Sequence, residues 1–217
     1  MMQPQNDFYT STGIHVYYKD QLQNNDINVE EIISLLEQKI PHHLLEEVEM
    51  VIVGWFDEFE ERELSAFYDS GTLYISNSQI DGEEMLNNTI HETAHSLEQP
   101  HGYLIYGDGE LKNEFLRKRE HLHDIMWANG YKIPKSVFLD PEYNEELDMF
   151  LYEDVGYGKL TGMTQGLFLN AYAVTSLREY FATGFTEYFT DSNHTFLKKL
   201  SPVLYSKISG LHTLEEN

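Results

Sequence analysis

The chain has 217 residues, of which 41% are hydrophobic and 13% aromatic, a composition typical of a folded globular protein. Its formal net charge of -23 disfavours nucleic acid and anionic membrane surfaces as partners, because phosphate groups would be repelled over most of the surface. The absence of cysteine excludes disulfides and thiolate metal ligands, so any metal must be held by histidine and carboxylate side chains. We expect most of the acidic excess to be solvated surface, with a cationic substrate or partner as the alternative.

The first part of the chain predicts strands with helical segments between them. Runs rich in β-branched and aromatic residues indicate strands at 14–18 and 48–56 and a hairpin formed by 65–68 and 72–76. From Asn28, a candidate cap, apolar residues at helical spacing predict a helix that Pro41 ends. The acidic residues at 57–63 indicate an exposed turn.

The next predicted helix has its own start and stop signals. Asp81 is a candidate N-cap, and Glu84, three residues later, completes a capping box. An apolar stripe at helical spacing follows, formed by Leu86, Ile90, Ala94 and Leu97. Pro100 and Gly102 predict the end of this helix.

This helix carries the pattern H-E-x-x-H as His91, Glu92 and His95. Two histidines at i and i+4 lie on one helix face, where both imidazoles can reach a single metal ion, and the adjacent glutamate can hold a water molecule on that metal. The pattern therefore predicts zinc chemistry, with Glu92 as the general base. The alternative is a pair of ordinary surface histidines on an amphipathic helix.

The second part of the chain predicts mostly helices. A long helix is expected at about 111–128, with His121 and His123 on different faces as surface or packing residues. Residues 132–154 indicate loop and short helix, and the glycines between 156 and 166 indicate a mobile stretch. A buried helix is predicted over 170–189, followed by a C-terminal helix interrupted at Pro202.

A catalytic zinc ion needs a third protein ligand, and two residues compete for this role. His101 stands ten residues after His91, the spacing of the H-E-x-x-H-x-x-G-x-x-H pattern, but Glu98 occupies the position of the glycine that lets the chain turn. The other candidate is Glu179, which shares a helix face with small residues that would let another helix approach closely. Glu179 also fits a capping box with Ser176, which would need no metal.

The H-E-x-x-H pattern, together with Tyr172 and the segment Arg178-Glu179-Tyr180-Phe181-Ala182-Thr183-Gly184-Phe185, resembles the catalytic domain of anthrax lethal factor and the related clostridial Pro-Pro endopeptidases. The resemblance covers roughly residues 48–210 and is specific at the two motifs. It implies that Glu179 is the third zinc ligand and that Tyr172, seven residues earlier, assists catalysis; packing is the alternative role for this tyrosine. Two departures bear on substrate specificity: the 83 residues from Ser96 to Arg178 make a longer connection than in compact members, and Thr183-Gly184 replaces a more usual pair.

We therefore expect an α+β, zincin-like domain spanning 1–217. Its N-terminal lobe, about 1–100, would hold a small twisted mixed sheet packed on the H-E-x-x-H helix, and its C-terminal lobe, about 101–217, would be mostly helical. The expected function is that of a zinc metalloendopeptidase of the gluzincin kind, with Zn²⁺ held by His91, His95 and Glu179, and with Glu92 and Tyr172 as catalytic residues. The expected partner is a protein or peptide substrate, with neither nucleic acid nor membrane.

Three alternatives remain open at this point. One is a non-catalytic, partner-binding domain of the same fold, another is a metzincin-spaced zinc hydrolase that uses His101, and the third is a zinc hydrolase that cleaves something other than a peptide bond. The polar segment 1–10 has no basic patch followed by an apolar stretch, and no run of about 18 apolar residues occurs, so we expect a cytoplasmic protein by default.

Overall fold

The computed structural model describes residues 7–61 and 64–214. The described residues form two compact units, one up to Pro100 and the other from His101 to Leu214. No helix in these residues is both long enough and apolar enough to cross a bilayer.

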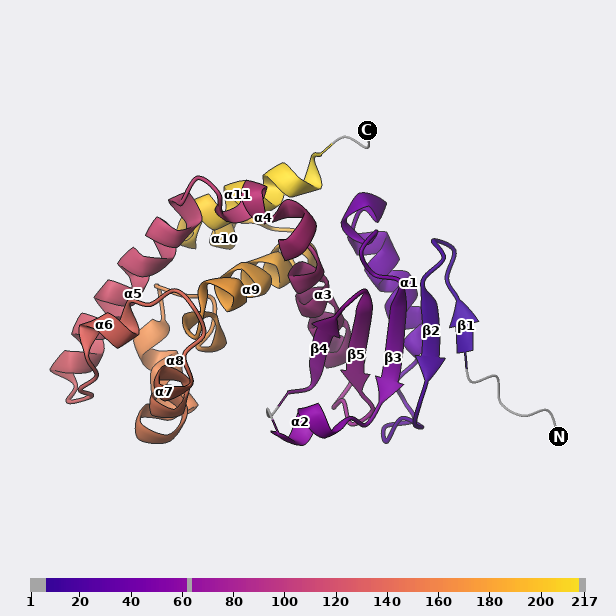
Figure 1. The fold of residues 1–217 in the computed structure, drawn as a ribbon, viewed down its shortest axis with the longest axis horizontal. Helices are drawn as coiled ribbons and strands as arrows, with labels where there is room; N and C mark the ends of the chain where they lie inside the picture. The colour runs from indigo at the N-terminus through magenta and orange to yellow at the C-terminus, as the bar shows by residue number, and fades with distance from the viewer. Residues whose placement is uncertain (1–6, 62–63, 215–217) are drawn as a thin grey trace. The chain divides into compact units, whose positions relative to one another are not determined.

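Unit 1 is built on a five-stranded sheet in the order β1-β2-β3-β5-β4 (Figure 1). Its inner pairs, β2 with β3 and β3 with β5, are parallel, whereas β1 and β4 join the two edges antiparallel. The sheet is therefore mixed, and with the helices it confirms the α+β class. The strand bounds are β1 Asp7–Tyr9, β2 His15–Tyr18, β3 Met50–Gly54, β4 Ala66–Asp69 and β5 Thr72–Ser76. The first of these strands was not predicted.

The expected hairpin is formed by β4 and β5, with Asp69 opposite Thr72. Its two turn residues, Ser70 and Gly71, both have positive φ, 46° and 85°. Positive φ at both central positions gives a turn whose twist matches that of the strands. The hairpin leads directly into the segment before the H-E-x-x-H helix.

The helical segments that lie wholly within the described residues of unit 1 are α1 Val29–Lys39, the 3₁₀ turn η1 His42–Leu44, α2 Asp57–Glu61 and α3 Gly82–Ser96. The predicted cap of α1 is confirmed, since Asn28 accepts a hydrogen bond from the Glu31 N–H at 3.3 Å. In Figure 1 α1 and α3 lie on one face of the sheet, where α3 packs against α1, β4 and β5. The sheet therefore supports the helix that carries the H-E-x-x-H pattern.

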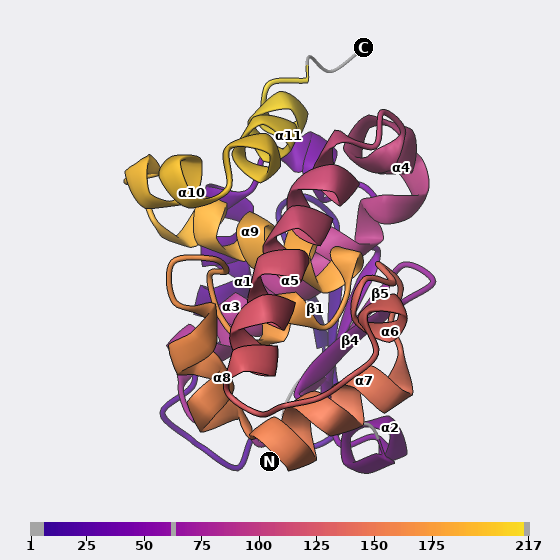
Figure 2. The ribbon, with the colours of Figure 1, turned by 90° about the vertical axis from the view of Figure 1, so that its left-hand side faces the viewer.

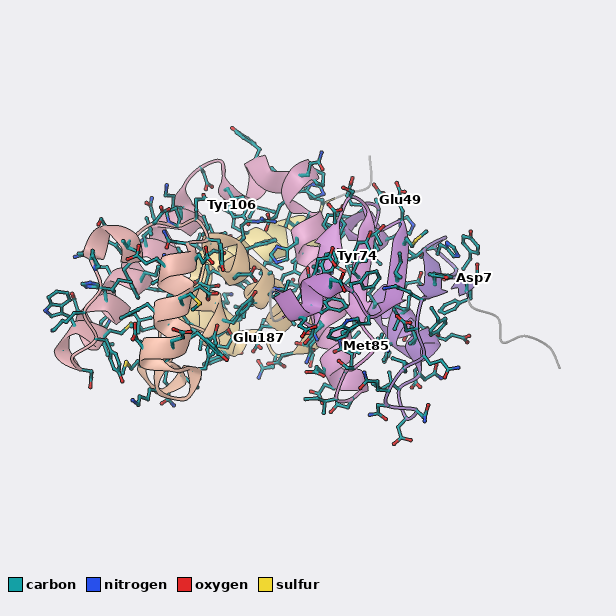
Figure 3. All side chains as sticks on the ribbon, turned by 60° about the horizontal axis from the view of Figure 1, so that its bottom comes forward. Asp7, Glu49, Tyr74, Met85, Tyr106 and Glu187 are labelled. Carbon is teal, nitrogen blue, oxygen red and sulfur yellow. The ribbon has the colours of Figure 1, made fainter. Side chains whose placement is uncertain are left out.

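An aromatic cluster explains why residues 57–61 of the acidic segment are helical instead of the expected exposed turn, of which residues 62 and 63 lie outside the described residues. Phe59 of α2 is buried and packs edge-on against Phe56, with 5.6 Å between ring centroids. Phe56 in turn packs on Tyr74, labelled in Figure 3, which stacks on Phe67 at 4.5 Å. Burial of Phe59 thus fixes one turn of helix that the charge pattern alone did not indicate.

The expected end of the H-E-x-x-H helix at Pro100 and Gly102 was wrong. The helix ends at Ser96, and a second helix, α4 Glu98–Tyr106, begins after Leu97. Proline is tolerated in a first helical turn, where its missing N–H has no helical partner, and Pro100 lies in that turn of α4. The boundary between the two units falls inside α4.

Unit 2 is helical, and α5 packs against four of its other helices, α6, α8, α9 and α11 (Figure 2). Residues 157–164 of the glycine-rich stretch form the helix α8. The bounds are α5 Glu110–Ala128, α6 Lys135–Phe138, α7 Glu145–Met149, the π-helix η2 Phe150–Val155, α8 Tyr157–Thr164, the 3₁₀ turn η3 Tyr172–Val174, α9 Leu177–Thr190, α10 Thr195–Leu200 and α11 Pro202–His212.

A buried carboxylate joins α5 to α9 and α11. Glu114 accepts hydrogen bonds from the Tyr180 hydroxyl at 3.0 Å and from the N–H groups of Val203 and Leu204 at 2.9 and 3.1 Å. These two N–H groups belong to the first turn of α11, so Glu114 serves as its cap. Burial, followed by the Glu114 charge, raises the pKa of Tyr180 above its usual range, so its hydroxyl remains a donor.

Two further side chains of unit 2 explain sequence features. His123 is buried beside Trp127 and Phe138 and contacts the Ile133 carbonyl at 3.0 Å, whereas His121 is exposed, which confirms their surface and packing roles. Gly184 lies where α9 meets α11, and a Cβ atom there would come within 2.7 Å of Leu204 Cγ. The glycine in Thr183-Gly184 is therefore a packing requirement of this chain.

Candidate metal ligands and catalytic side chains

The two histidines of the H-E-x-x-H pattern lie one helical turn apart on α3. Their ring centroids are 5.1 Å apart, and both side chains are partly buried. Ile90 and Ala94, which precede each histidine by one residue, are completely buried. The helix therefore presents both imidazoles on a face beside its packed face.

The ring orientation of His95 is fixed by a neighbouring carboxylate. Nδ1 of His95 lies 3.0 Å from Oε1 of Glu98, and the two side chains are only 11% and 13% exposed. An ionised carboxylate can only accept, so Nδ1 carries the proton and Nε2 of the neutral ring holds the lone pair. A carboxylate that orients a histidine in this way is typical of metal sites.

Glu98 was missed as a functional residue by the sequence reasoning, which considered it only as a substitute for glycine. The signal that could have found it is its position three residues after His95, one turn further along the chain. The structure places it as the first residue of α4.

Glu92 follows His91 on α3 and is also partly buried. The packed face of this helix carries three hydroxyl groups. Thr89, Thr93 and Ser96 each donate to a main-chain carbonyl of the preceding turn, at 2.6 to 2.8 Å. These buried hydroxyls are therefore satisfied within α3 itself.

Side-chain hydrogen bonds connect α3 to the segment before it. Asn88 donates to Gln79 Oε1 at 2.9 Å, and Gln79 donates to the Ser65 carbonyl at 3.0 Å. At the helix start Asp81 accepts from the Glu84 N–H at 2.8 Å, while the Glu84 carboxylate accepts from Ile80, one residue earlier than in the expected capping box. The three residues of the pattern thus lie on a helix that is capped at its start, joined to the preceding segment and packed against the sheet.

His101 lies on α4, in the second unit. The metzincin pattern needs a sharp turn at the residue three after the second histidine. Glu98 occupies that position and is the first residue of a nine-residue helix, and Leu97 before it has φ -77° and ψ -15°. The local backbone gives no support to the role of His101 as the third ligand.

Tyr172 lies in the short 3₁₀ turn η3, and the residue is 38% exposed. Its carbonyl accepts two hydrogen bonds from Thr175, one from the N–H at 3.0 Å and one from Oγ1 at 2.9 Å. The expectation of one continuous helix over 170–189 was wrong, because the extended backbone of Ser176 separates η3 from α9. Tyr172 therefore stands on a turn of its own.

Glu179 is the third residue of α9 and is partly buried between exposed Arg178 and buried Tyr180. Its N–H donates to the Ser176 hydroxyl at 3.1 Å, so Ser176 is the N-cap of this helix. That hydrogen bond is made by the main-chain N–H of Glu179, and the carboxylate takes no part in it.

Comparisons with known proteins found no match: no family model, no curated protein and no solved structure is significantly similar to this chain.

Proposed function

We propose that the protein is a zinc-dependent metalloendopeptidase of the zincin-like fold, related to the lethal factor catalytic domain and the Pro-Pro endopeptidases. The observation that carries the proposal is the hydrogen bond between His95 Nδ1 and Glu98, on a helix that bears the complete H-E-x-x-H pattern. A metal-ligating histidine almost always donates its other ring N–H to a carboxylate, a main-chain carbonyl or water, and Glu98 is in the position to be this partner of His95.

The proposed ligands are His91 and His95 from α3 and Glu179 from α9. Two imidazole nitrogens and one carboxylate oxygen are a donor set that could hold a metal ion. Zinc is the metal we propose, because His₂Glu is an established set of catalytic zinc ligands and the chain has no thiolate. Zinc, when bound, supplies a Lewis acid that acidifies water and polarises a carbonyl group.

The chain's own groups would perform the proton transfers. Glu92, beside His91, would take a proton from the attacking water onto its carboxylate and deliver it to the amine nitrogen of the leaving fragment. The Tyr172 hydroxyl would donate a hydrogen bond to the carbonyl oxygen as negative charge develops there. The exposed position of Tyr172 and the partial burial of Glu92 are compatible with access to a peptide.

The test combines metal analysis with cleavage of a peptide library by the full chain. We expect about one zinc per chain and cleavage that is lost in Glu92→Gln, because an amide cannot accept the proton, while the zinc content of this variant stays near that of the parent. Glu83→Gln is a matched control, since Glu83 is an exposed residue of the same helix. Full activity of Glu92→Gln would refute the mechanism, and a chain without zinc would favour the non-catalytic binding domain.

A further inference from the structure

Arg119 is the largest fully buried side chain of the described residues. It projects from α5 between the rings of Phe115 and Phe138, whose centroids lie 4.8 and 5.5 Å from its guanidinium carbon. Within the described part of the chain, its hydrogen bonds all go to main-chain carbonyl oxygens.

The four carbonyls come from two segments of unit 2. Nη1 donates to Phe138, at 2.9 Å, and to Asp140, both at or after the end of α6. Nε and Nη2 donate to Val174 and Thr175, each at 2.8 Å, in the junction between η3 and α9. One guanidinium therefore clamps two loops together.

A main-chain hydrogen bond closes the same contact. The N–H of Leu177, the first residue of α9, donates to the Pro141 carbonyl at 2.8 Å. The segment after α6 is thus joined to the start of α9 on both sides of Ser176.

The clamped junction leads directly to two of the proposed functional residues. Thr175, whose carbonyl Arg119 binds, donates both its N–H and its hydroxyl to the carbonyl of Tyr172. Ser176, the next residue, caps α9 and binds the N–H of Glu179. Glu179 lies within the helix α9, whereas Tyr172 lies in a three-residue turn, in which the Ala173 N–H donates to Asn170 Oδ1 at 2.9 Å.

The chemistry of arginine makes this clamp rigid. Burial lowers the pKa of Arg119 to about 10, which leaves the group charged at neutral pH. A buried charge is costly unless its donors are satisfied, so losing any of the four acceptors is strongly opposed. Lysine keeps the charge but has one nitrogen, and its point-like head cannot reproduce the planar fork that serves two loops.

We infer that Arg119 is a positioning residue, which acts through the η3–α9 junction to hold the Tyr172 hydroxyl in the orientation that catalysis requires. The inference rests on the proposed function only in the role of Tyr172. The ordering of the junction is a separate statement that can be tested without zinc or substrate.

The first experiment measures amide hydrogen exchange in the zinc-free protein. Arg119→Lys should raise exchange in peptides covering 172–177 on the order of 10-fold or more, because the Thr175 N–H bond is no longer held, and should leave α3 unchanged. Arg117→Lys is the matched control: this arginine lies two residues earlier, is exposed, and donates to a carbonyl of its own helix, that of Asn113. Equal protection in the two variants would overturn the inference.

The second experiment is a double-mutant cycle on the zinc-loaded enzyme. Arg119→Lys should lower kcat on the order of 10²-fold with KM and zinc content near the parent values, because a small misplacement of a catalytic group is enough for such a loss. In a Tyr172→Phe background the same change should cost almost nothing further, since the hydroxyl that it positions is already absent. Equal losses in both backgrounds would mean that Arg119 acts through the general stability of the unit, and would overturn the inference.

Two outcomes need separate readouts. If Arg119→Lys does not fold, the cycle is repeated with Thr175→Val, which removes only the hydroxyl that binds the Tyr172 carbonyl, and a loss independent of Tyr172 again overturns the inference. If the parent protein neither binds zinc nor cleaves peptides, the proposed function fails, while the exchange experiment still decides whether Arg119 orders the junction.

Discussion

The carboxylate of Glu98 lies 3.0 Å from Nδ1 of His95, and neither side chain is more than 13% exposed. This pair fixes which ring nitrogen faces away from α4 and so determines the nitrogen that is available to a metal. A metal ligand selected in this way is sensitive to its partner even though the partner does not touch the metal.

Glu98→Ala should therefore weaken zinc binding by about 10- to 100-fold while the fold is kept, as measured by competition with a chromophoric chelator. The neighbouring Gln99→Ala is the control, because Gln99 is an exposed residue of the same helical turn. Unchanged zinc affinity in Glu98→Ala would remove the hydrogen bond from the proposed site.

The identity of the third ligand is tested by two alanine variants. Glu179→Ala should lower the zinc content sharply and leave α9 capped, because the hydrogen bond to Ser176 comes from the main chain of residue 179. His101→Ala should leave the zinc content near that of the parent. The opposite result would indicate a metzincin-spaced site and would discard the resemblance to the lethal factor family.

Tyr172→Phe should lower kcat and kcat/KM together, on the order of 10²–10³-fold, because a donor to the developing oxyanion contributes mainly to the transition state. Zinc content and melting temperature should hardly change, since residue 172 is 38% exposed and phenylalanine keeps the aromatic ring. Tyr103→Phe, at an exposed tyrosine of α4, controls for the loss of a hydroxyl elsewhere. Near-parent kinetics of Tyr172→Phe would leave this residue with a packing role.

Gly184→Ala should destabilise unit 2 by about 1–3 kcal/mol, because the added methyl group meets Leu204 of α11 in a packed core. The matched control is Gly162→Ala in α8, where a methyl group meets nothing within 4 Å; replacing an exposed helical glycine there should stabilise by about 0.5–1 kcal/mol. Thermal unfolding of both variants provides the measurement. Equal melting temperatures would show that α9 and α11 separate easily.

Local signals in the sequence predicted those elements whose caps and turns are set by their own residues. Asn28, Asp81 and the Ser70-Gly71 turn are examples, because each acts through contacts within a few positions of itself. Elements that depend on distant partners were missed or misjudged. Helix α2 forms because Phe59 packs on Phe56 and on Phe67 of β4, and the break at Ser176 occurs where Arg119, more than 50 positions earlier, binds the carbonyls before it.

The residues of the candidate site show the same difference between local and distant signals. The H-E-x-x-H residues could be chosen from spacing alone, since i and i+4 positions must share a helix face. Glu98 was overlooked because its position was considered only as the place of a turn glycine, whereas the structure places it beside His95. The start of α9 had a local signal in the Ser176 cap, whereas the hydrogen bonds from Arg119 to the residues just before it could not be predicted, because Arg119 belongs to another helix.

The hydrogen bonds of Glu114 determine when during synthesis unit 2 can complete its fold. Val203, whose N–H donates to Glu114, is translated 89 residues after it. At the usual rate of translation this takes roughly 4 to 18 s. Unit 1 has all its strands and α3 within the first 100 residues, so it can fold at the ribosome while α5 still awaits α11. The two histidines therefore lie on a folded helix before Glu179 has been translated. Under the proposed function, a nascent chain would remain without peptidase activity until the second unit has folded.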